Sequence, residues 1–227
     1  MDAFYLSLVS PAGASLMEKT ADFNRSAHRP DPAVLADLPE ERREEILSLL
    51  NARLKERPFL RRSWPSADDF ADFWDFSFEP RRLMLLDDPT FEALILRFGA
   101  AVWAPKLGRI VDRADVAQVK KELGELHGYV TGQGRLALGE LRTPFLSGRT
   151  PLTRQGLGRS GLLAVNLCWS PLPPELAARR PERLVEPEAL SALPASEVFR
   201  KKLFDKLKRM LTKEVAPPWR NCFASMV

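Results

Sequence analysis

Apolar residues recur at helical spacing in several segments of the chain, and the clearest of these segments begins near residue 88. The pair Asp88-Pro89 suits the start of a helix, because aspartate caps a first turn and proline is tolerated at the first helical position. The apolar positions that follow at helical spacing are Phe91, Leu94, Ile95, Phe98 and Val102. This pattern predicts a helix that packs against a core, and Pro105 should bend or end it near Trp103.

Four further helices are predicted from the same kind of pattern. The first covers residues 40–55, where acidic residues precede a stripe of isoleucine and leucine, and Pro58 ends it. The second is short and follows the capping residue Ser66. Another covers 112–130, and the last covers 196 to about 215. The last helix has one apolar face, formed by Phe199, Leu203, Leu207, Met210 and Leu211, and an opposite face that is basic.

Prolines and glycines divide these segments from one another. Residues 1–39 should form short helices and Pro-rich turns, and glycines between 128 and 148 mark a looser connection. Six of the nineteen prolines lie between Pro171 and Pro194, which predicts a Pro-rich surface excursion over 171–195. The chain lacks strict alternation of apolar and polar residues and an Asn-Gly turn. We therefore predict an all-α fold, a single irregular multi-helix domain over 1–227.

Composition agrees with an ordinary globular protein of 227 residues, 45% apolar and 28% charged. The chain has no run of about 20 apolar residues, the length that a membrane-spanning helix requires. Its first residues include Asp2 and lack the basic start of a signal peptide, so we expect a cytoplasmic protein. Two cysteines and two histidines make neither a disulfide framework nor a zinc site, and Cys168 lies in an apolar run where a small buried side chain is expected.

The positive charge is concentrated near the C-terminal end. The whole chain carries a net charge of +4, and the segment 197–214 alone carries the same excess. Its basic residues are Arg200, Lys201, Lys202, Lys206, Lys208, Arg209 and Lys213, against the acidic Glu197, Asp205 and Glu214. A basic amphipathic helix over 196–216 could meet an acidic protein, a nucleic-acid backbone or an anionic membrane surface, and a plain solvated face is the alternative.

A cluster of acids precedes this region by more than a hundred residues. Asp68, Asp72 and Asp75 share one face of the short predicted helix, and we interpret them as a solvated or protein-binding face and not as a metal site. Two sets of residues are thus candidates for protein interfaces. Lys201, Lys202, Lys208 and Arg209 would steer an acidic partner, and the three aspartates would meet a basic one.

Motifs that could indicate catalysis are weak. Residues 156–161 match G-x-G-x-x-G, but no strand precedes them, so a flexible or closely packed helix start is the better interpretation. Ser160 lacks the full G-x-S-x-G motif of a nucleophile, and His127 fits the C-terminal end of a predicted helix. We expect no catalytic residue, no cofactor and no metal site.

The order of several segments is distinctive. Residues 94–100 are followed by a bent helix through Arg109 and Ile110, and then by a helix over 115–129. Later pieces are residues 159–164, Trp169, an amphipathic helix over 199–215, and then Pro217, Cys222 and Phe223. This order resembles the SctK family, the YscK- and PscK-type accessory proteins of bacterial type III secretion systems. The resemblance covers about 91–169 and 196–223, a little under half of the chain.

The resemblance implies a function in protein transport and virulence. SctK-like proteins are cytoplasmic, predominantly helical components of the sorting platform beneath the injectisome. They link the cytosolic domain of the inner-membrane ring protein SctD to the SctQ pod, which connects to SctL and the ATPase SctN. The family has no known catalytic residues, so the implied function is a non-enzymatic adaptor, held at the cytosolic face of the inner membrane through its partners.

Three other functions stay open. A nucleic-acid-binding helical protein that uses the C-terminal basic helix is the principal alternative, although no nucleic acid and no membrane insertion are expected of an adaptor. An export chaperone would more often be acidic and dimeric. A hydrolase that uses Ser160 is the most distant alternative.

Overall fold

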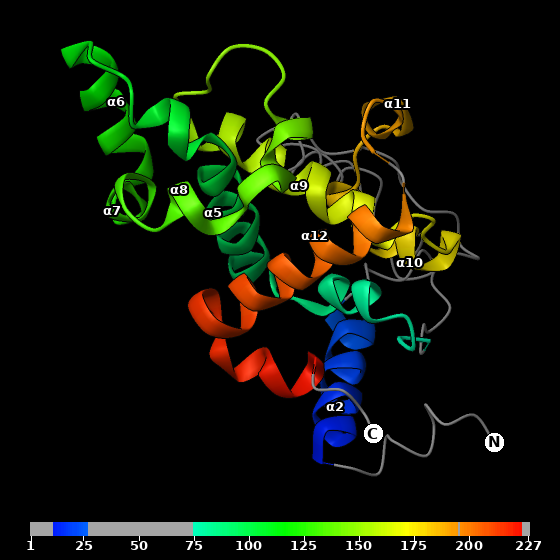
Figure 1. Cartoon of the computed structure of the whole chain (residues 1–227). Helices are drawn as coiled ribbons and strands as arrows, with labels where there is room; N and C mark the ends of the chain where they lie inside the picture. The colour runs from blue at the N-terminus through cyan, green and yellow to red at the C-terminus, as the bar shows by residue number, and fades with distance from the viewer. Residues whose placement is uncertain (1–10, 27–74, 195, 224–227) are drawn as a thin grey trace, which may run out of the picture. The chain divides into compact units, whose positions relative to one another are not determined.

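The computed structural model describes residues 11–26, 75–194 and 196–223, and all regular structure in these ranges is helical (Figure 1). The predicted all-α class is confirmed in these ranges. The helices predicted over 40–55 and after Ser66 lie outside the described residues. Two compact units are present. The first combines Met1–Leu85, Pro171–Glu186 and Ala224–Val227, and the second combines Leu86–Ser170 and Pro187–Phe223.

The described part of the first unit is built around aromatic and arginine side chains. Its elements are α2 (Pro11–Ser26), η2 (Glu79–Leu85), α10 (Pro174–Arg179) and η4 (Pro181–Arg183). The Phe23 and Phe76 rings pack edge to face with centroids 6.1 Å apart. The guanidinium groups of Arg179 and Arg180 lie 5.7 and 5.8 Å from the centroid of the Phe23 ring.

The segment predicted as a surface excursion over 171–195 is partly buried in this unit. Leu176 has no exposed surface and Arg183 is 1% exposed, with the Arg183 Nη1 donating to the Met84 carbonyl over 3.0 Å. Pro174 and Pro181 each lie in the first turn of a short helix. Backbone amides there have no acceptor within the helix, so proline, which lacks an amide hydrogen, costs no helical hydrogen bond. Prolines in this segment therefore begin helices as well as turns.

The second unit is organised around α5 (Asp88–Leu107) and α9 (Arg154–Trp169), which cross one another (Figure 1). The cap of α5 is Asp87, one residue earlier than predicted, and its carboxylate accepts from the Thr90 amide over 3.4 Å. All five residues of the predicted apolar face of α5 are buried. Pro105 was expected to bend or end this helix near Trp103, and the helix does not end there. It continues to Leu107 with Pro105 inside it, because Trp103, Ala104 and Leu107 are buried and packing offsets one lost hydrogen bond.

The backbones of α5 and α9 come into contact where they cross. A Cβ atom added to Gly99 would lie 1.8 Å from the Leu157 carbonyl oxygen, and one added to Gly161 would lie 1.9 Å from the Ile95 carbonyl oxygen. Glycine is therefore required at both positions for this close approach. The G-x-G-x-x-G segment lies in the first turns of α9, and close packing is one of the two interpretations that the sequence left for it.

The helix predicted over 112–130 is two helices. Asp112 caps α6 (Arg113–Leu123) through bonds from the amides of residues 114 and 115, and α7 (Leu126–Thr131) follows. Gly124 separates them with a φ of 52°, a left-handed conformation that glycine adopts without strain. Two short elements come next, α8 (Gly134–Ala137) and η3 (Gly139–Phe145), and the Phe145 ring packs edge to face on Phe98 with centroids 5.7 Å apart.

The C-terminal part of the second unit begins with α11 (Pro187–Ser191) and continues with α12 (Glu197–Met210). Ser196 caps α12 by accepting from the Phe199 amide over 3.3 Å. The helix predicted to reach residue 215 changes into a π turn, η5 (Leu211–Val215), and η6 (Pro217–Phe223) ends the described chain. None of the helices that the described residues form is both long and apolar enough to cross a bilayer.

Candidate protein-binding site

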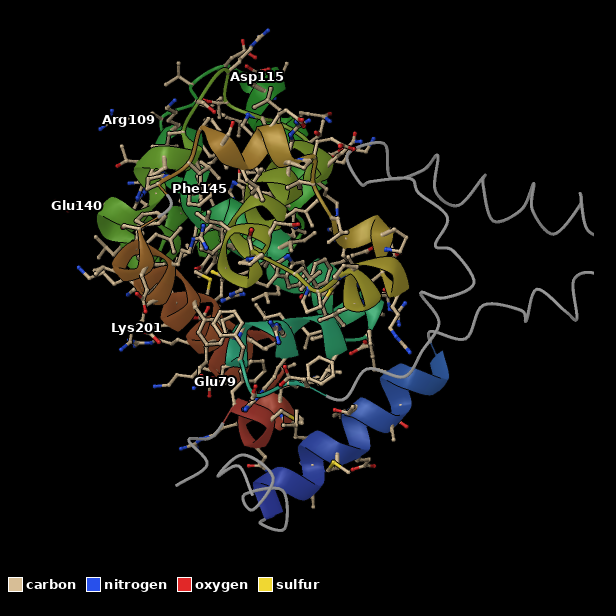
Figure 2. The ribbon with its side chains drawn as sticks, turned by 90° about the vertical axis from the view of Figure 1, so that its right-hand side faces the viewer. Glu79, Arg109, Asp115, Glu140, Phe145 and Lys201 are labelled. Atoms are coloured by element: carbon tan, nitrogen blue, oxygen red, sulfur yellow. The ribbon has the colours of Figure 1, made fainter. Side chains whose placement is uncertain are left out.

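The outer side of α12 carries a group of cations that we call the α12 basic face. Its members are Lys201, Lys202, Lys206, Lys208 and Arg209. Lys201, Lys202 and Arg209 are exposed, whereas Lys206 and Lys208 are half-buried. Figure 2 shows the Lys201 side chain directed away from the ribbon. The helix can present these cations because its apolar residues Leu203, Leu207 and Met210 are buried on the other side.

One edge of the α12 basic face borders a pocket of about 260 Å³, which we call the α8–α12 pocket. The edge is formed by Lys202, Lys206 and Arg209, which follow one another at i, i+4 and i+7 along the helix. The pocket is lined by Tyr129, Gln133, Leu136, Ala137, Lys206, Arg209, Met210 and Glu214. Its apolar part combines Met210, which is 3% exposed, with Leu136, which is 87% exposed. Apolar and cationic groups thus meet at this end of α12.

Two residues of this lining, Tyr129 and Glu214, contact Arg97, which does not itself line the pocket. Arg97 Nε donates to Glu214 Oε2 over 2.6 Å, and the two side chains are 21% and 29% exposed. The Arg97 guanidinium also lies 4.0 Å from the centroid of the Tyr129 ring. The pKa of Tyr129 is raised to about 12, chiefly by burial and also by the Glu214 charge, with Arg97 acting in the opposite direction. Glu214 and Arg97 therefore neutralise one another beside an uncharged phenol.

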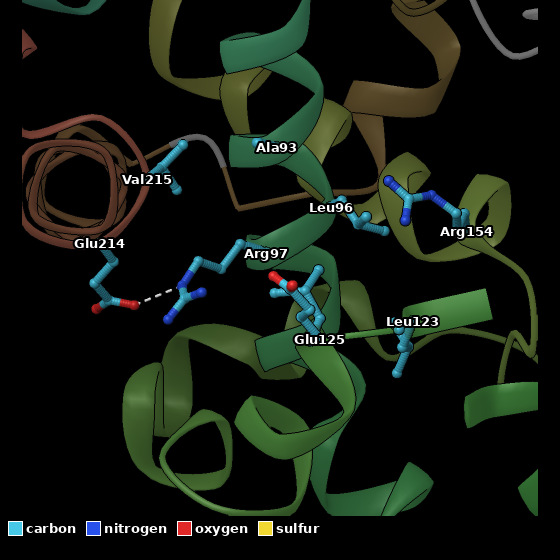
Figure 3. Close-up of a pocket in the computed structure, with 10 residues that line it drawn as sticks. Ala93, Leu96, Arg97, Leu123, Glu125, Arg154, Glu214 and Val215 are labelled. Carbon is cyan, nitrogen blue, oxygen red and sulfur yellow. Dashed lines mark hydrogen bonds and ion pairs between the residues drawn. The ribbon is translucent and has the colours of Figure 1, made fainter. Parts of the chain in front are cut away.

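A second pocket of about 410 Å³ lies on the other side of this ion pair (Figure 3). It is lined by Ala93, Leu96, Arg97, Leu123, Gly124, Glu125, Leu126, Arg154, Glu214 and Val215. Figure 3 shows Arg97 reaching across to Glu214, with Glu125 and Arg154 on other parts of the wall. The backbone amide of Arg154 also donates to the Glu122 carboxylate over 2.9 Å. Charges of both signs line this second pocket, so it has no electrostatic preference for an anion or a cation.

The predicted interface residues are distributed over both units. Lys201, Lys202, Lys208 and Arg209 lie together on α12, where Arg209 also lines the α8–α12 pocket. Asp75 belongs to the first unit, and its carboxylate accepts from Ser77 Oγ over 2.5 Å and from Arg81 Nη1 over 2.9 Å. The Ser77 hydrogen bond and Arg81 hold the pKa of Asp75 below its usual value. Asp68 and Asp72 lie outside the described residues, so the acidic face stays a prediction.

Sequence reasoning missed several residues of the α8–α12 pocket. Lys206 follows Lys202 by one helical turn, so the spacing alone places it on the same face as the predicted interface cations. Tyr129 lies at the end of the helix predicted over 112–130, and Leu136 lies in the glycine-rich region that was predicted as a looser connection. Arg97 and Glu214 are 117 residues apart, and no periodicity in the sequence relates them.

Of the residues considered for catalysis, Ser160 has a buried side-chain partner and His127 lies within a short helix. Ser160 is buried on α9, where its Oγ accepts from Trp103 Nε1 over 2.9 Å. His127 lies in the first turn of α7 and not at a helix C-terminus, because Gly124 ends the preceding helix early; its amide donates to the Gly124 carbonyl. Cys168 is buried, and burial raises the pKa of its thiol. The described residues contain no group of three or more His, Cys, Asp and Glu side chains that could hold a metal ion.

No protein-family model, curated protein sequence or solved structure matches this chain.

Proposed function

We propose that this chain is a non-enzymatic, protein-binding adaptor of a bacterial type III secretion system. In this function it links an SctD-like inner-membrane ring protein to an SctQ-like pod protein, and through the pod indirectly to SctL and the ATPase SctN. The observation that carries the proposal is the α12 basic face, in which five cations occupy the outer side of one helix whose apolar side is buried. The SctK-like order of segments over 91–169 and 196–223 supports the assignment to secretion.

A bridging function requires a body that keeps two partner surfaces at a fixed separation. The close crossing of α5 and α9 at Gly99 and Gly161 suits this requirement, because packed backbones leave little room for one helix to slide along the other. The α12 basic face would steer an acidic partner toward one side of this body. The chain would be cytoplasmic and would be held at the inner membrane through its partners.

The proposal is tested by co-purification with the SctD-like and SctQ-like proteins encoded near its gene. In the double variant Lys201→Glu and Lys202→Glu, both reversed side chains are exposed, so folding should be unaffected while binding of one partner is lost. The matched control reverses Lys120 and Lys121, which are exposed on α6, and should keep both partners. If the native chain retains neither partner, the adaptor function is wrong.

The α12 basic face also favours a second function, nucleic-acid binding. Lysine and arginine side chains bind phosphates by displacing counterions, so such binding weakens steeply as salt is raised. Two results would support this alternative. The chain would bind duplex DNA at low salt and lose it at moderate salt, and the Lys201→Glu, Lys202→Glu variant would not bind DNA at low salt. An adaptor that recognises proteins would keep its partners in the presence of excess DNA.

A further inference from the structure

The size and lining of the α8–α12 pocket suit side chains of a protein segment better than a cofactor. Its volume of about 260 Å³ is below the roughly 300–1,000 Å³ of most small-molecule sites, and is better suited to individual side chains. The wall is formed by residues of α7, α8, α12 and η5 together with Gln133, all within the second unit. A side chain that entered it would meet the buried Met210 and the partly buried Ala137.

The charge that the pocket offers to a partner is positive. Glu214 contributes a carboxylate to the wall, but Arg97 Nε binds that carboxylate over 2.6 Å from the other side. Lys206 and Arg209 are the remaining charged residues of the lining, and Lys202 extends the same edge by one turn. Asp205 is exposed among the α12 cations, but the five cations outweigh it, so carboxylates are favoured beside Lys206 and Arg209 over a basic segment.

Leu136 adds an apolar contact at the mouth of this positive site. A single exposed leucine is common on protein surfaces and by itself indicates nothing. Here the side chain is 87% exposed and lines the same pocket as Met210 and the cations Lys206 and Arg209. Val111 is 94% exposed yet lines neither of the pockets described above, which makes it a suitable comparison.

We infer that the α8–α12 pocket binds an acidic, amphipathic segment of a partner protein. An apolar side chain of the segment contacts Leu136 and Met210, and its carboxylates lie beside Lys206 and Arg209. The apolar contact gives affinity and the charges select acidic segments, the usual division between a buried anchor and a polar rim. A phosphate backbone would use the cations but not the leucine. This inference rests on the protein-binding part of the proposed function and is independent of the secretion partners named there.

The test uses the full chain and short fluorescent peptides, with binding followed by anisotropy. A peptide of glutamate and leucine residues should bind more tightly than one in which serine replaces leucine, and more tightly than one of lysine and leucine. Leu136→Ser and Arg209→Glu should each weaken binding of the glutamate and leucine peptide by about tenfold or more. Arg209→Lys keeps the charge and should bind within a few fold of the native chain. The matched controls Val111→Ser and Lys121→Glu should bind like the native chain.

A second measurement locates the peptide. The methyl signal of Met210, one of five methionines, should shift in the nuclear magnetic resonance spectrum when the peptide is added, and should not shift in Leu136→Ser. Equal binding of the serine peptide, native-like binding by both pocket variants, or displacement of the peptide by duplex DNA would each overturn the inference. A chain that dimerises through Leu136 without peptide would also overturn it, because the occupant would then be a second copy. If the peptide fails to bind while co-purification with the ring and pod proteins succeeds, the pocket assignment is wrong and the adaptor function stands.

Discussion

Arg97 of α5 and Glu214 of η5 are 117 residues apart in the sequence and form an ion pair with an Nε to Oε2 distance of 2.6 Å. This pair joins the central helix of the second unit to the π turn that follows α12. It also separates the two pockets, since both residues line the larger one and Glu214 lines the α8–α12 pocket as well. The position of the α12 basic face relative to α7 and α8 therefore depends in part on this contact.

Replacing Glu214 with glutamine should loosen the π turn without unfolding the protein. Because both side chains are partly exposed, the loss in the free energy of unfolding should be about 1 kcal/mol. Urea denaturation measures this loss, and hydrogen exchange of the amides of 211–215 should become faster. A double-mutant cycle with Arg97→Met isolates the pair, because Arg97→Met also removes the cation–π contact with Tyr129. A coupling energy near zero would contradict the structural role of the pair.

The glycines at the crossing of α5 and α9 should be among the least replaceable residues of the second unit. Gly99→Ala and Gly161→Ala each place a Cβ atom within 2 Å of a backbone carbonyl oxygen, so the two helices must move apart. We expect each variant to lose about 3 kcal/mol or more of unfolding free energy, measured by urea denaturation. Gly128→Ala on α7 is the matched control, because its Cβ would meet nothing within 4 Å and alanine favours a helix. Near-native stability of the Gly99 and Gly161 variants would show that the helices do not cross so closely.

Ser160 should be important for stability and not for catalysis. Ser160→Ala removes the oxygen that accepts from Trp103 Nε1 and leaves a buried donor without that partner. The expected cost is about 1–3 kcal/mol in the free energy of unfolding, measured by thermal or urea denaturation. Ser160→Thr keeps a hydroxyl and serves as the comparison. An esterase activity of the native chain that disappears in Ser160→Ala without loss of stability would instead revive the hydrolase alternative.

The sequence predicts well those features that depend on neighbouring residues. The buried face of α5 and the start of the last helix near Ser196 follow from the spacing of apolar residues, and both are present. The break at Gly124 was missed, because a glycine within an apolar period indicates equally a weak helix position and a left-handed turn. The sequence could not decide whether Pro105 ends α5, because burial of Trp103 and Leu107 depends on distant segments.

The candidate site was predicted only in part for the same reason. Lys201, Lys202, Lys208 and Arg209 can be placed on one helix from spacing alone, and the structure has them there. Whether these cations border a pocket depends on where α8 packs, which tertiary contacts decide. The sequence therefore predicted the basic surface but not Leu136, the apolar group beside it.

Ionisation of the Tyr129 hydroxyl should make the protein less stable as the pH rises in the alkaline range. Its pKa is raised from 10.0 to about 12 by burial and by Glu214, so the folded chain keeps the phenol proton at a pH where the unfolded chain loses it. The associated stability is fully present below pH 10 and is lost as the pH rises toward 12. Between pH 9 and 11 the free energy of unfolding of the native chain should fall by about 1 kcal/mol more than that of Tyr129→Phe, which lacks the titrating group. Urea denaturation of both proteins at the two pH values gives this difference, and the lysines that titrate in the same range affect both proteins alike. A difference between the two proteins that stays constant with pH would mean that Tyr129 ionises equally in the folded and unfolded chain.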